Sequence, residues 1–341
     1  MTTQAAASND QPNPGFVMQI LNSYQRTAAL RAAIQLDLFT VIAEGNETAA
    51  AIAGRCKATE RGIRILCDYL TIVGLLAKRD KLYSLSQDAA IFLNRKSPAY
   101  VGTITDFLVR AETLDVFMDL ADTIRDPEKS LRDRAVMKPE NPAWVEFARA
   151  MGPLMTFPAA GIAETVGAAK GESWKVLDIA AGHGMFGIAI AQQNPNAEIF
   201  ALDWARVLEV ACENAKSAGV GARHHLLPGS FFDRDLGTGY HLALITNFLH
   251  HFDIATGESI LKKVHAVLAP GGRVVILDFI PNDDRITPPA AAAFSMTMLG
   301  HTIAGDAYTF AEYQRMLGNA GYASGEIHPL PGPLSVIISQ A

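Results

Sequence analysis

The residues best suited to chemistry are a cluster of glycines and the two acids on either side of it. Asp178 lies within a short apolar run, and Gly182, Gly184 and Gly187 follow it. Glycines let the backbone turn sharply and allow a ligand to approach with no Cβ in the way. Asp203 lies 21 positions after Gly182, where a carboxylate can accept two hydrogen bonds from a ribose diol. The spacing predicts a nucleotide-type binding turn, and by itself it fits a dinucleotide as well as a nucleoside.

A second group of polar residues follows later in the chain: His250, His251, Asp253 and Asp278. A histidine can exchange a proton near neutral pH. A lone histidine is more often a satisfied core residue, but a place at the end of a strand favours function. In an extended chain His250 and His251 would face opposite ways, which makes them poor ligands for one metal ion. We therefore expect no metal site.

The elements that must position these residues alternate between strands and helices after residue 172, which predicts an α/β fold with a Rossmann-like, mostly parallel sheet. We expect helices between the first five strands and at about 309–320. A short Pro-Gly-Pro connection at 331–333 predicts that the last two strands form an antiparallel hairpin. The seven predicted strands are 175–180, 198–203, 224–228, 241–249, 273–280, 323–329 and 334–339.

Each of the first five strands delivers a polar group at its carboxyl end, the edge where open α/β sheets bind ligands. The loop after the third strand combines a small polar residue with an aromatic one and could hold an adenine. This convergence carries more weight than any single motif. The residues predicted to bind the cofactor are Asp178, Gly182, Gly184, Asp203, Trp204, Ser230, Phe231 and Asn247.

The N-terminal part of the chain indicates a separate, mainly helical domain. Apolar residues at helical spacing over 16–42 predict one long helix or two, and Thr48 and Thr59 are expected to cap two more helices. A hairpin pattern over Leu76–Leu82 completes a winged-helix arrangement. Residues 1–100 hold 11 Lys and Arg against 8 Asp and Glu, without the basic footprint of a DNA reader. A dimerising role is the preferred interpretation.

A helical segment over 101–170 links the two halves. Phe147, Met151, Met155 and Phe157 recur along it at roughly helical spacing, either as core residues or as the lining of an apolar substrate pocket. We predict three parts: a dimerisation domain over 1–105, a helical linker over 106–170 that contributes to the substrate pocket, and a cofactor-binding domain over 171–341.

Composition limits the classes of function. The 341 residues are 49% hydrophobic and 19% charged, and the formal net charge of −6 argues against nucleic acid or an anionic membrane as partner. Three cysteines without metal-ligand spacing, no signal-peptide pattern and no apolar run long enough to span a bilayer lead us to expect a cytoplasmic protein.

Three features together resemble the S-adenosylmethionine-dependent methyltransferases of the class I fold. They are the Asp178-x-x-x-Gly-x-Gly pattern, Ala269-Pro-Gly-Gly leading into the fifth strand, and a closing hairpin after a preceding helical domain. Over about residues 16–341 the chain looks like the plant and bacterial small-molecule O-methyltransferases of the caffeate and hydroxyindole type. Leu249-His250-His251-Phe252-Asp253 matches the family's fourth-strand motif.

The resemblance implies a homodimer joined by the N-terminal domain, S-adenosylmethionine as methyl donor, and a metal-free reaction at a hydroxyl of a small aromatic metabolite. It implies His250 as general base and Asp278, in place of the more usual Glu, as the carboxylate that orients it. His251 is the second choice of base, or a substrate contact. In this family the helix over 289–301 covers the acceptor pocket. The residues expected to contact substrate are Phe147, Met151, Met155, His251, Met298 and His301.

Two positions depart from the family pattern. Gly229-Ser230 replaces the frequent Gly-Asp of the adenine loop, and a second acid beside the base is replaced by Ala307, with Asp306 next to it. Three alternatives remain open at this point: methyl transfer to carbon or nitrogen, an NAD-dependent oxidoreductase, and a winged-helix regulator that senses a ligand.

Overall fold

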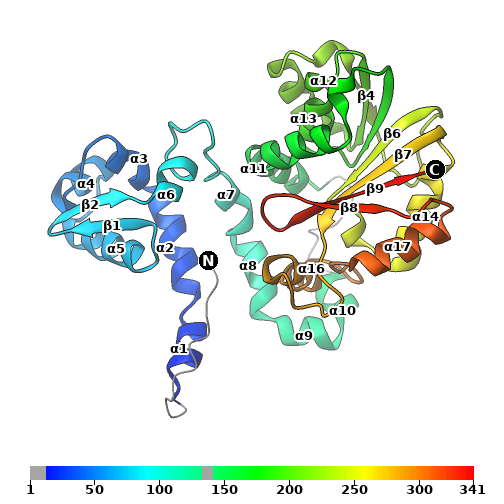
Figure 1. Ribbon diagram of the computed structural model, residues 1–341. Coiled ribbons are helices and arrows are strands. Elements are labelled where there is room, and N and C mark those ends of the chain that lie inside the picture. Colours follow the sequence, from blue (N-terminus) through cyan, green and yellow to red (C-terminus); the bar gives the residue numbers. More distant parts are fainter. Residues whose placement is uncertain (1–12, 133–140) are drawn as a thin grey trace. The chain divides into compact units, whose positions relative to one another are not determined.

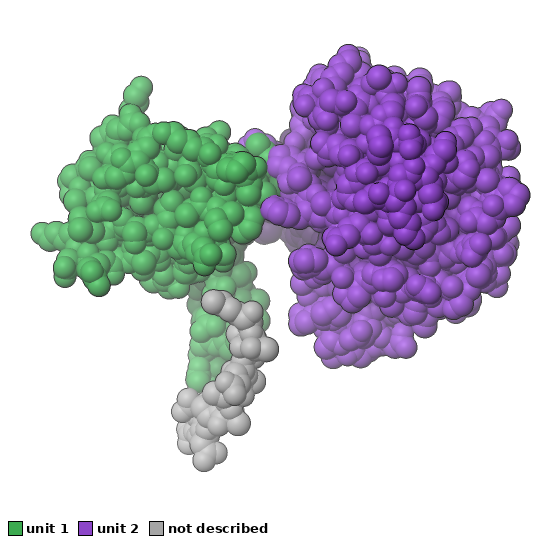
Figure 2. Space-filling model, turned by 45° about the horizontal axis from the view of Figure 1, so that its top comes forward, with its two compact units in different colours: residues 1–105 green, residues 106–341 purple. Residues whose placement is uncertain are grey.

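The computed structural model describes residues 13–132 and 141–341. The chain forms two compact units, Met1–Thr105 and Asp106–Ala341 (Figure 2). Within these described ranges, no helix is both long and apolar enough to cross a membrane.

The first unit begins with three helices where one or two were predicted. Residues 22–23 and 36–37 interrupt the periodic stretch, and Asp37 adopts a left-handed φ of 54°. Thr48 and Thr59 cap the next two helices through their side chains, as predicted. A two-stranded antiparallel hairpin then precedes a last short helix (Figure 1). The elements are α1 (Gly15–Leu21), α2 (Tyr24–Gln35), α3 (Leu38–Ala43), α4 (Ala49–Cys56), α5 (Glu60–Ile72), β1 (Leu76–Arg79), β2 (Leu82–Leu85) and α6 (Gln87–Phe92).

The described part of the predicted linker is helical. Its longest helix, α11, runs for 23 residues directly before the sheet and carries the Phe147–Met155 stripe. The helices are α7 (Ile104–Leu108), α8 (Ala111–Met118), α9 (Leu120–Arg125), α10 (Pro127–Arg132) and α11 (Ala143–Thr165).

A seven-stranded sheet forms the centre of the second unit, in the order β5-β4-β3-β6-β7-β9-β8. Strands β3 to β7 are parallel to one another. Strand β9 runs antiparallel to both of its neighbours, β7 and β8, so the predicted hairpin is confirmed. The strands are β3 (Trp174–Ile179), β4 (Ala197–Asp203), β5 (His224–Pro228), β6 (Tyr240–Thr246), β7 (Leu268–Phe279), β8 (Glu326–Pro329) and β9 (Leu334–Gln340).

One predicted helix is absent: the connection between β5 and β6, residues 229–239, contains only turns and bends. Gly229, Gly237 and Gly239 all have positive φ there, a backbone conformation that a helix cannot accommodate. The other predicted helices are present, and two short helices that were not assigned to a strand connection follow β7 (Figure 1). These helices are α12 (Met185–Gln193), α13 (Ala205–Ser217), α14 (Ile254–His265), α15 (Pro289–Ala292), α16 (Phe294–His301) and α17 (Phe310–Asn319).

Alternate residues of the strands face two separate cores, as expected for a sheet buried on both sides. Leu242 and Leu244 of β6 pack with α11 and α12. Ala243 and Ile245 pack with α14 and α17 on the other face. The two cores thereby fix the positions of the carboxyl ends of β3, β4, β6 and β7.

Candidate active site

The glycine turn after β3 depends on glycine for two different reasons. Gly182 and Gly184 have φ angles of 56° and 74°, in the left-handed region. A Cβ on Gly187 would lie 2.9 Å from Asp178 Oδ2, so the first turn of α12 packs directly on the carboxylate. Asp178 Oδ2 accepts a hydrogen bond from the Gly187 N–H at 3.2 Å. The acid therefore fixes the turn through this hydrogen bond.

Asp178 is fully buried, and its Oδ1 has no hydrogen-bond partner among the described residues. Burial raises the pKa of this carboxyl to about 7, against the lowering effect of the Gly187 N–H, and Asp203 raises it further. A buried acceptor without a partner costs about 1–3 kcal/mol. Such an atom is expected where a ligand supplies the missing donor.

Asp203, at the end of β4, is held by two backbone amides. Oδ2 accepts from the Gly182 N–H at 2.8 Å and Oδ1 from the Trp204 N–H at 2.7 Å. Burial raises its pKa to about 6, while the two amide hydrogen bonds oppose the rise. A cavity of about 370 Å³ lies beside Trp204, between the first residues of α11 and those of α13. The carboxylate is thus fixed at the glycine turn with lone pairs left for a ligand.

The loop after β5 contains Ser230 and Phe231, which were predicted to bind the cofactor, and their side chains have different surroundings. The Ser230 hydroxyl oxygen accepts from the Phe232 N–H at 3.1 Å and so serves its own loop. Phe231 is 4% exposed and packs in the core, whereas Phe232 is 51% exposed. The Phe231 ring is 6.2 Å from that of Phe248, between centroids.

Asn247, directly after β6, has a φ of 50°, which is uncommon for a residue with a side chain. Its Nδ2 contacts the Met155 sulfur at 3.9 Å, and its buried Oδ1 has no partner in the part of the chain that the structure describes. Strands β3 and β6 are direct neighbours, so Asp178 and Asn247 leave two unpaired acceptors on adjacent strands. Together they fit a ligand that carries positive charge or N–H and O–H donors.

His250 lies in a 3-10 turn, Leu249–His251, and is 3% exposed. Its Nδ1 is 2.6 Å from Asp278 Oδ1, near the end of β7. Asp278 Oδ1 also accepts from the Phe279 N–H, and Oδ2 accepts from the Tyr313 hydroxyl, both at 2.8 Å. Because Nδ1–H donates to this carboxylate, Nε2 is left as the proton acceptor.

Tyr313 of α17 is a partner that sequence reasoning missed, since nothing in the local pattern links it to a strand end 35 positions earlier. Burial, the charge of Asp278 and the hydrogen bond to it raise its pKa well above the ordinary value. Tyr313 therefore stays protonated and acts as a donor to Asp278.

The predicted orientation of His251 is wrong. The chain turns after β6 instead of continuing extended, and this brings the His250 and His251 rings to 4.4 Å between centroids. Burial, His250 and His301 lower the pKa of His251 well below its usual range, and its buried Nδ1 has no partner within residues 13–132 and 141–341. The argument from opposite faces therefore fails, although the described residues include no cluster of three or more His, Cys, Asp or Glu that could hold a metal ion.

The residues predicted to contact substrate lie on α11, α16 and the His250 turn. Met155 contacts Asn247, Met298 is 3% exposed, and His301 Nδ1 is bonded to the Thr297 carbonyl at 2.9 Å. The Phe147 ring packs edge-on against Phe107 and Trp144.

Three further features of the acceptor side were not predicted. Phe157, which the sequence placed on the same stripe, is 69% exposed and points away from the core. The Phe294 ring of α16 lies 4.8 Å from the His250 ring and stacks on the Phe279 ring at 3.8 Å, both between centroids. The Trp144 ring lies 6.3 Å from that of His251.

Comparison with known proteins adds to this geometry. A family model described as an O-methyltransferase domain matches residues 170–323, and an O-methyltransferase dimerisation domain matches residues 18–95. A solved structure from Nostoc punctiforme, assigned as a candidate O-methyltransferase, is 48% identical, with 97% of this chain and 100% of that chain covered and a TM-score of 0.92.

Two other similar proteins have named activities. The 3-hydroxy-5-methyl-1-naphthoate 3-O-methyltransferase of Streptomyces sahachiroi is 28% identical over 317 residues, which cover 90% of this chain and 89% of that protein. The human N-acetylserotonin methyltransferase in complex with S-adenosylmethionine has the same fold, with a TM-score of 0.82, 19% identity and coverage of 98% and 99%.

Proposed function

This chain belongs to the S-adenosylmethionine-dependent O-methyltransferase family, and from that premise we propose that it methylates a hydroxyl of a small aromatic metabolite with His250 as general base. One observation carries the proposal. A buried histidine, oriented through Nδ1 by Asp278, stands at the same sheet edge as a glycine turn with unpaired buried acceptors.

The methyl donor supplies a carbon already activated by a sulfonium, so the chain must bind, align and deprotonate. Asp203 would hold the ribose hydroxyls, and Trp204, Ser230 and Phe231 would surround the adenine. The unpaired oxygens of Asp178 and Asn247 suit the cationic end of the donor. Gly182 and Gly184 allow its close approach.

His250 would remove the hydroxyl proton of the acceptor at Nε2. Asp278 holds the tautomer that leaves Nε2 free and stabilises the imidazolium that forms. The Phe279 N–H donates to one oxygen of Asp278 and the Tyr313 hydroxyl to the other, so this carboxylate is held at both oxygens. Burial of the pair excludes water that would compete for the proton.

The acceptor would lie among Phe147, Met151, Met155 and Met298, with His251 and His301 as polar contacts. His301 Nδ1–H donates to a main-chain carbonyl, so its Nε2 is an acceptor, and the buried Nδ1 of His251 lacks a partner among the residues described. Aromatic and thioether groups suit a flat ring, and two imidazoles suit further hydroxyl groups on it. Hydroxynaphthoates and polyhydroxylated phenols are therefore the first acceptors to assay.

We further propose that the functional molecule is a homodimer joined through a domain over 1–105, with 106–170 supplying part of the acceptor pocket and 171–341 the donor site. The match to a dimerisation domain over residues 18–95 supports this.

The first experiment is calorimetric titration with S-adenosylhomocysteine and, separately, with NAD and NADH. Micromolar binding of the first alone is expected. Binding of a nicotinamide nucleotide instead would favour an oxidoreductase, and binding of none would favour a regulator. Nuclear magnetic resonance of the product then distinguishes methylation of oxygen from methylation of carbon or nitrogen.

The second experiment replaces the base. His250→Ala should lower kcat by roughly two or more orders of magnitude with little change in affinity for S-adenosylhomocysteine. His328→Ala, which removes a half-exposed histidine of β8, is the control and should leave kcat unchanged. Equal activity in His250→Ala and wild type would remove His250 from the mechanism.

A further inference from the structure

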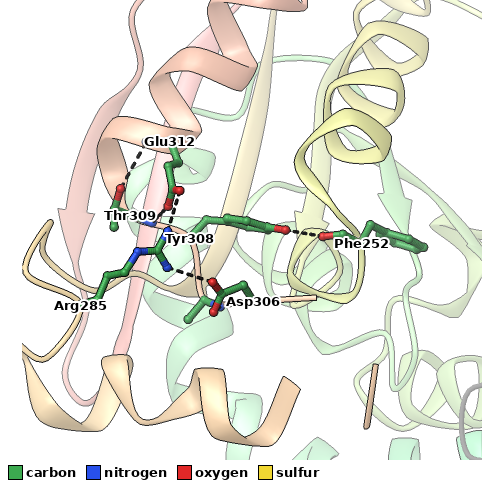
Figure 3. Close-up of polar contacts among 7 residues, drawn as sticks. Phe252, Arg285, Asp306, Tyr308, Thr309 and Glu312 are labelled. Atoms are coloured by element: carbon green, nitrogen blue, oxygen red, sulfur yellow. Dashed lines mark hydrogen bonds and ion pairs between the residues drawn. The ribbon is translucent and has the colours of Figure 1, made fainter. Parts of the chain in front are cut away.

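The segment between α16 and α17, Thr302–Thr309, donates two hydrogen bonds to the main chain at the turn that carries His250. The Asp306 N–H donates to the His250 carbonyl oxygen at 3.0 Å. The Tyr308 hydroxyl donates to the Phe252 carbonyl oxygen at 2.5 Å (Figure 3). The first accepting carbonyl belongs to the middle residue of the turn and the second to the residue just beyond it, so the segment holds the backbone on both sides of His251.

Gly305 brings this segment into direct contact with the turn. A Cβ at this position would collide with the His250 carbonyl oxygen, and it would lie 2.6 Å from Thr302 Oγ1 and 3.1 Å from the His251 carbonyl carbon. The φ of Gly305 is not left-handed, so close approach is what requires glycine here. Any side chain at position 305 would push the segment away from the turn, or the turn away from Asp278.

Arg285 fixes the segment at its other side (Figure 3). Its guanidinium bonds Asp306 Oδ2 at 2.9 Å and Glu312 Oε1 at 2.6 Å. The other oxygen of Glu312 accepts from the Thr309 N–H, in the capping box that begins α17. One arginine thus joins the loop after β7, the Thr302–Thr309 segment and the helix that carries Tyr313.

Asp306 is the acid next to the position where the family pattern places a second carboxylate beside the base. Its side chain does not reach His250: Oδ2 pairs with Arg285, and Oδ1 accepts from the Ala307 N–H at 2.8 Å. The acid acts on His250 only through the main-chain N–H that it and Arg285 hold in place.

We propose that Arg285 and the Thr302–Thr309 segment form a positioning clamp for the general base, an inference that rests on the proposed role of His250. The hydrogen bond to Asp278 fixes one ring nitrogen, but the ring still moves with its backbone. The clamp fixes that backbone and so determines where Nε2 points. Small errors in the position of a reacting group lower rates steeply. The residues of the clamp are positioning residues, because they act through His250.

The test that needs no acceptor is nuclear magnetic resonance of the free protein. The Nδ1 proton of His250, in a 2.6 Å bond to a carboxylate, should give a downfield resonance that disappears in His250→Ala. In Arg285→Ala this resonance should shift or exchange faster with water, and Arg285→Lys should restore it partly. Arg149→Ala, which breaks a comparably exposed ion pair between α11 and α13, is the control and should leave the resonance unchanged. An unchanged resonance in both Arg285→Ala and Tyr308→Phe would overturn the clamp.

A kinetic double-mutant cycle completes the test, with rates counted per site that binds S-adenosylhomocysteine. Arg285→Ala should lower kcat about tenfold with little change in either KM, and Arg149→Ala should not. In the His250→Ala background, Arg285→Ala should change the rate less than twofold, since the group that it positions is gone. A full tenfold loss in that background would overturn the clamp and leave the proposed role of His250 as base standing. No loss in His250→Ala itself would overturn the proposed base.

Discussion

At the scale of single residues, the proposed donor site contains two carboxyl groups whose pKa values burial has raised. The pKa of Asp178 is raised to about 7 and that of Asp203 to about 6, because desolvation outweighs the backbone hydrogen bonds that each carboxylate accepts. In the free protein these groups contribute stability that is present below about pH 4 and is lost as the pH rises through 6 and 7. A cationic ligand reverses the preference, because it favours the ionised carboxylates.

We expect the affinity for S-adenosylmethionine to depend on pH. The dissociation constant should rise as the pH falls below about 7, and more steeply below about 6, because protons must then leave for the cation to bind. S-adenosylhomocysteine, which lacks the sulfonium charge, should show a weaker dependence. Calorimetry between pH 5 and 8 measures both, with Asp203→Asn expected to remove the steeper part. A constant affinity over this range would refute the raised pKa values.

At the scale of elements, the strands and the glycine turn after β3 were predictable, whereas the turn after β6 was not. All seven strands of the sheet were identified from the sequence, and the apolar pattern is clearest for β3 and β6, whose residues are almost all buried. The orientation of His251 depended on a 3-10 turn, which has no comparable pattern. The bonds from Tyr313 to Asp278 and from Asp306 to His250 join segments far apart in the chain, so only the fold reveals them. His250 and the carboxylate expected to orient it, Asp278, were therefore accessible to sequence reasoning, whereas the contacts of Tyr313 and Asp306 that hold them in place were not.

Helix α17 carries Tyr313 and follows directly after the segment that contains Asp306. The contribution of its first turn to the free energy of unfolding can be measured. Thr309 Oγ1 accepts from the Glu312 N–H, while Glu312 accepts from the Thr309 N–H. Thr309→Ala removes one half of this capping box and should lower the free energy of unfolding by about 1 kcal/mol. Thr309→Ser keeps the hydroxyl and is the matched control. Urea denaturation compares the two, and equal stability of the Ala and Ser variants would show that the cap contributes nothing.

At the scale of the whole molecule, the first unit has an apolar surface that its own fold leaves uncovered. Helix α1 contains no buried residue. Six large apolar side chains on and next to it are at least half exposed: Phe16, Val17, Met18, Ile20, Leu21 and Tyr24. Clustered apolar groups of this size usually mark a protein interface, and the match to a dimerisation domain begins at residue 18. A second copy of the chain is the proposed occupant.

Charges placed on this helix should separate the dimer. Ile20→Asp combined with Leu21→Asp should give a monomer in light scattering at micromolar concentration, because two carboxylates cannot be desolvated in an apolar interface. Gln19→Asp adds a charge at an exposed polar position of the same helix and serves as control. A double variant that stays dimeric would place the interface elsewhere.

The strand order also constrains how this protein is made. Strand β9 is the last of the seven in the chain, yet it lies inside the sheet, between β7 and β8. During synthesis, β7 therefore has an open edge until β9 emerges from the ribosome, and β8 has no strand to join. Asp278 pairs with Ser335 across this final contact. The nascent chain thus exposes an unpaired strand edge next to the proposed catalytic carboxylate, and the interval between the synthesis of β7 and that of β9 is when chaperones would matter most.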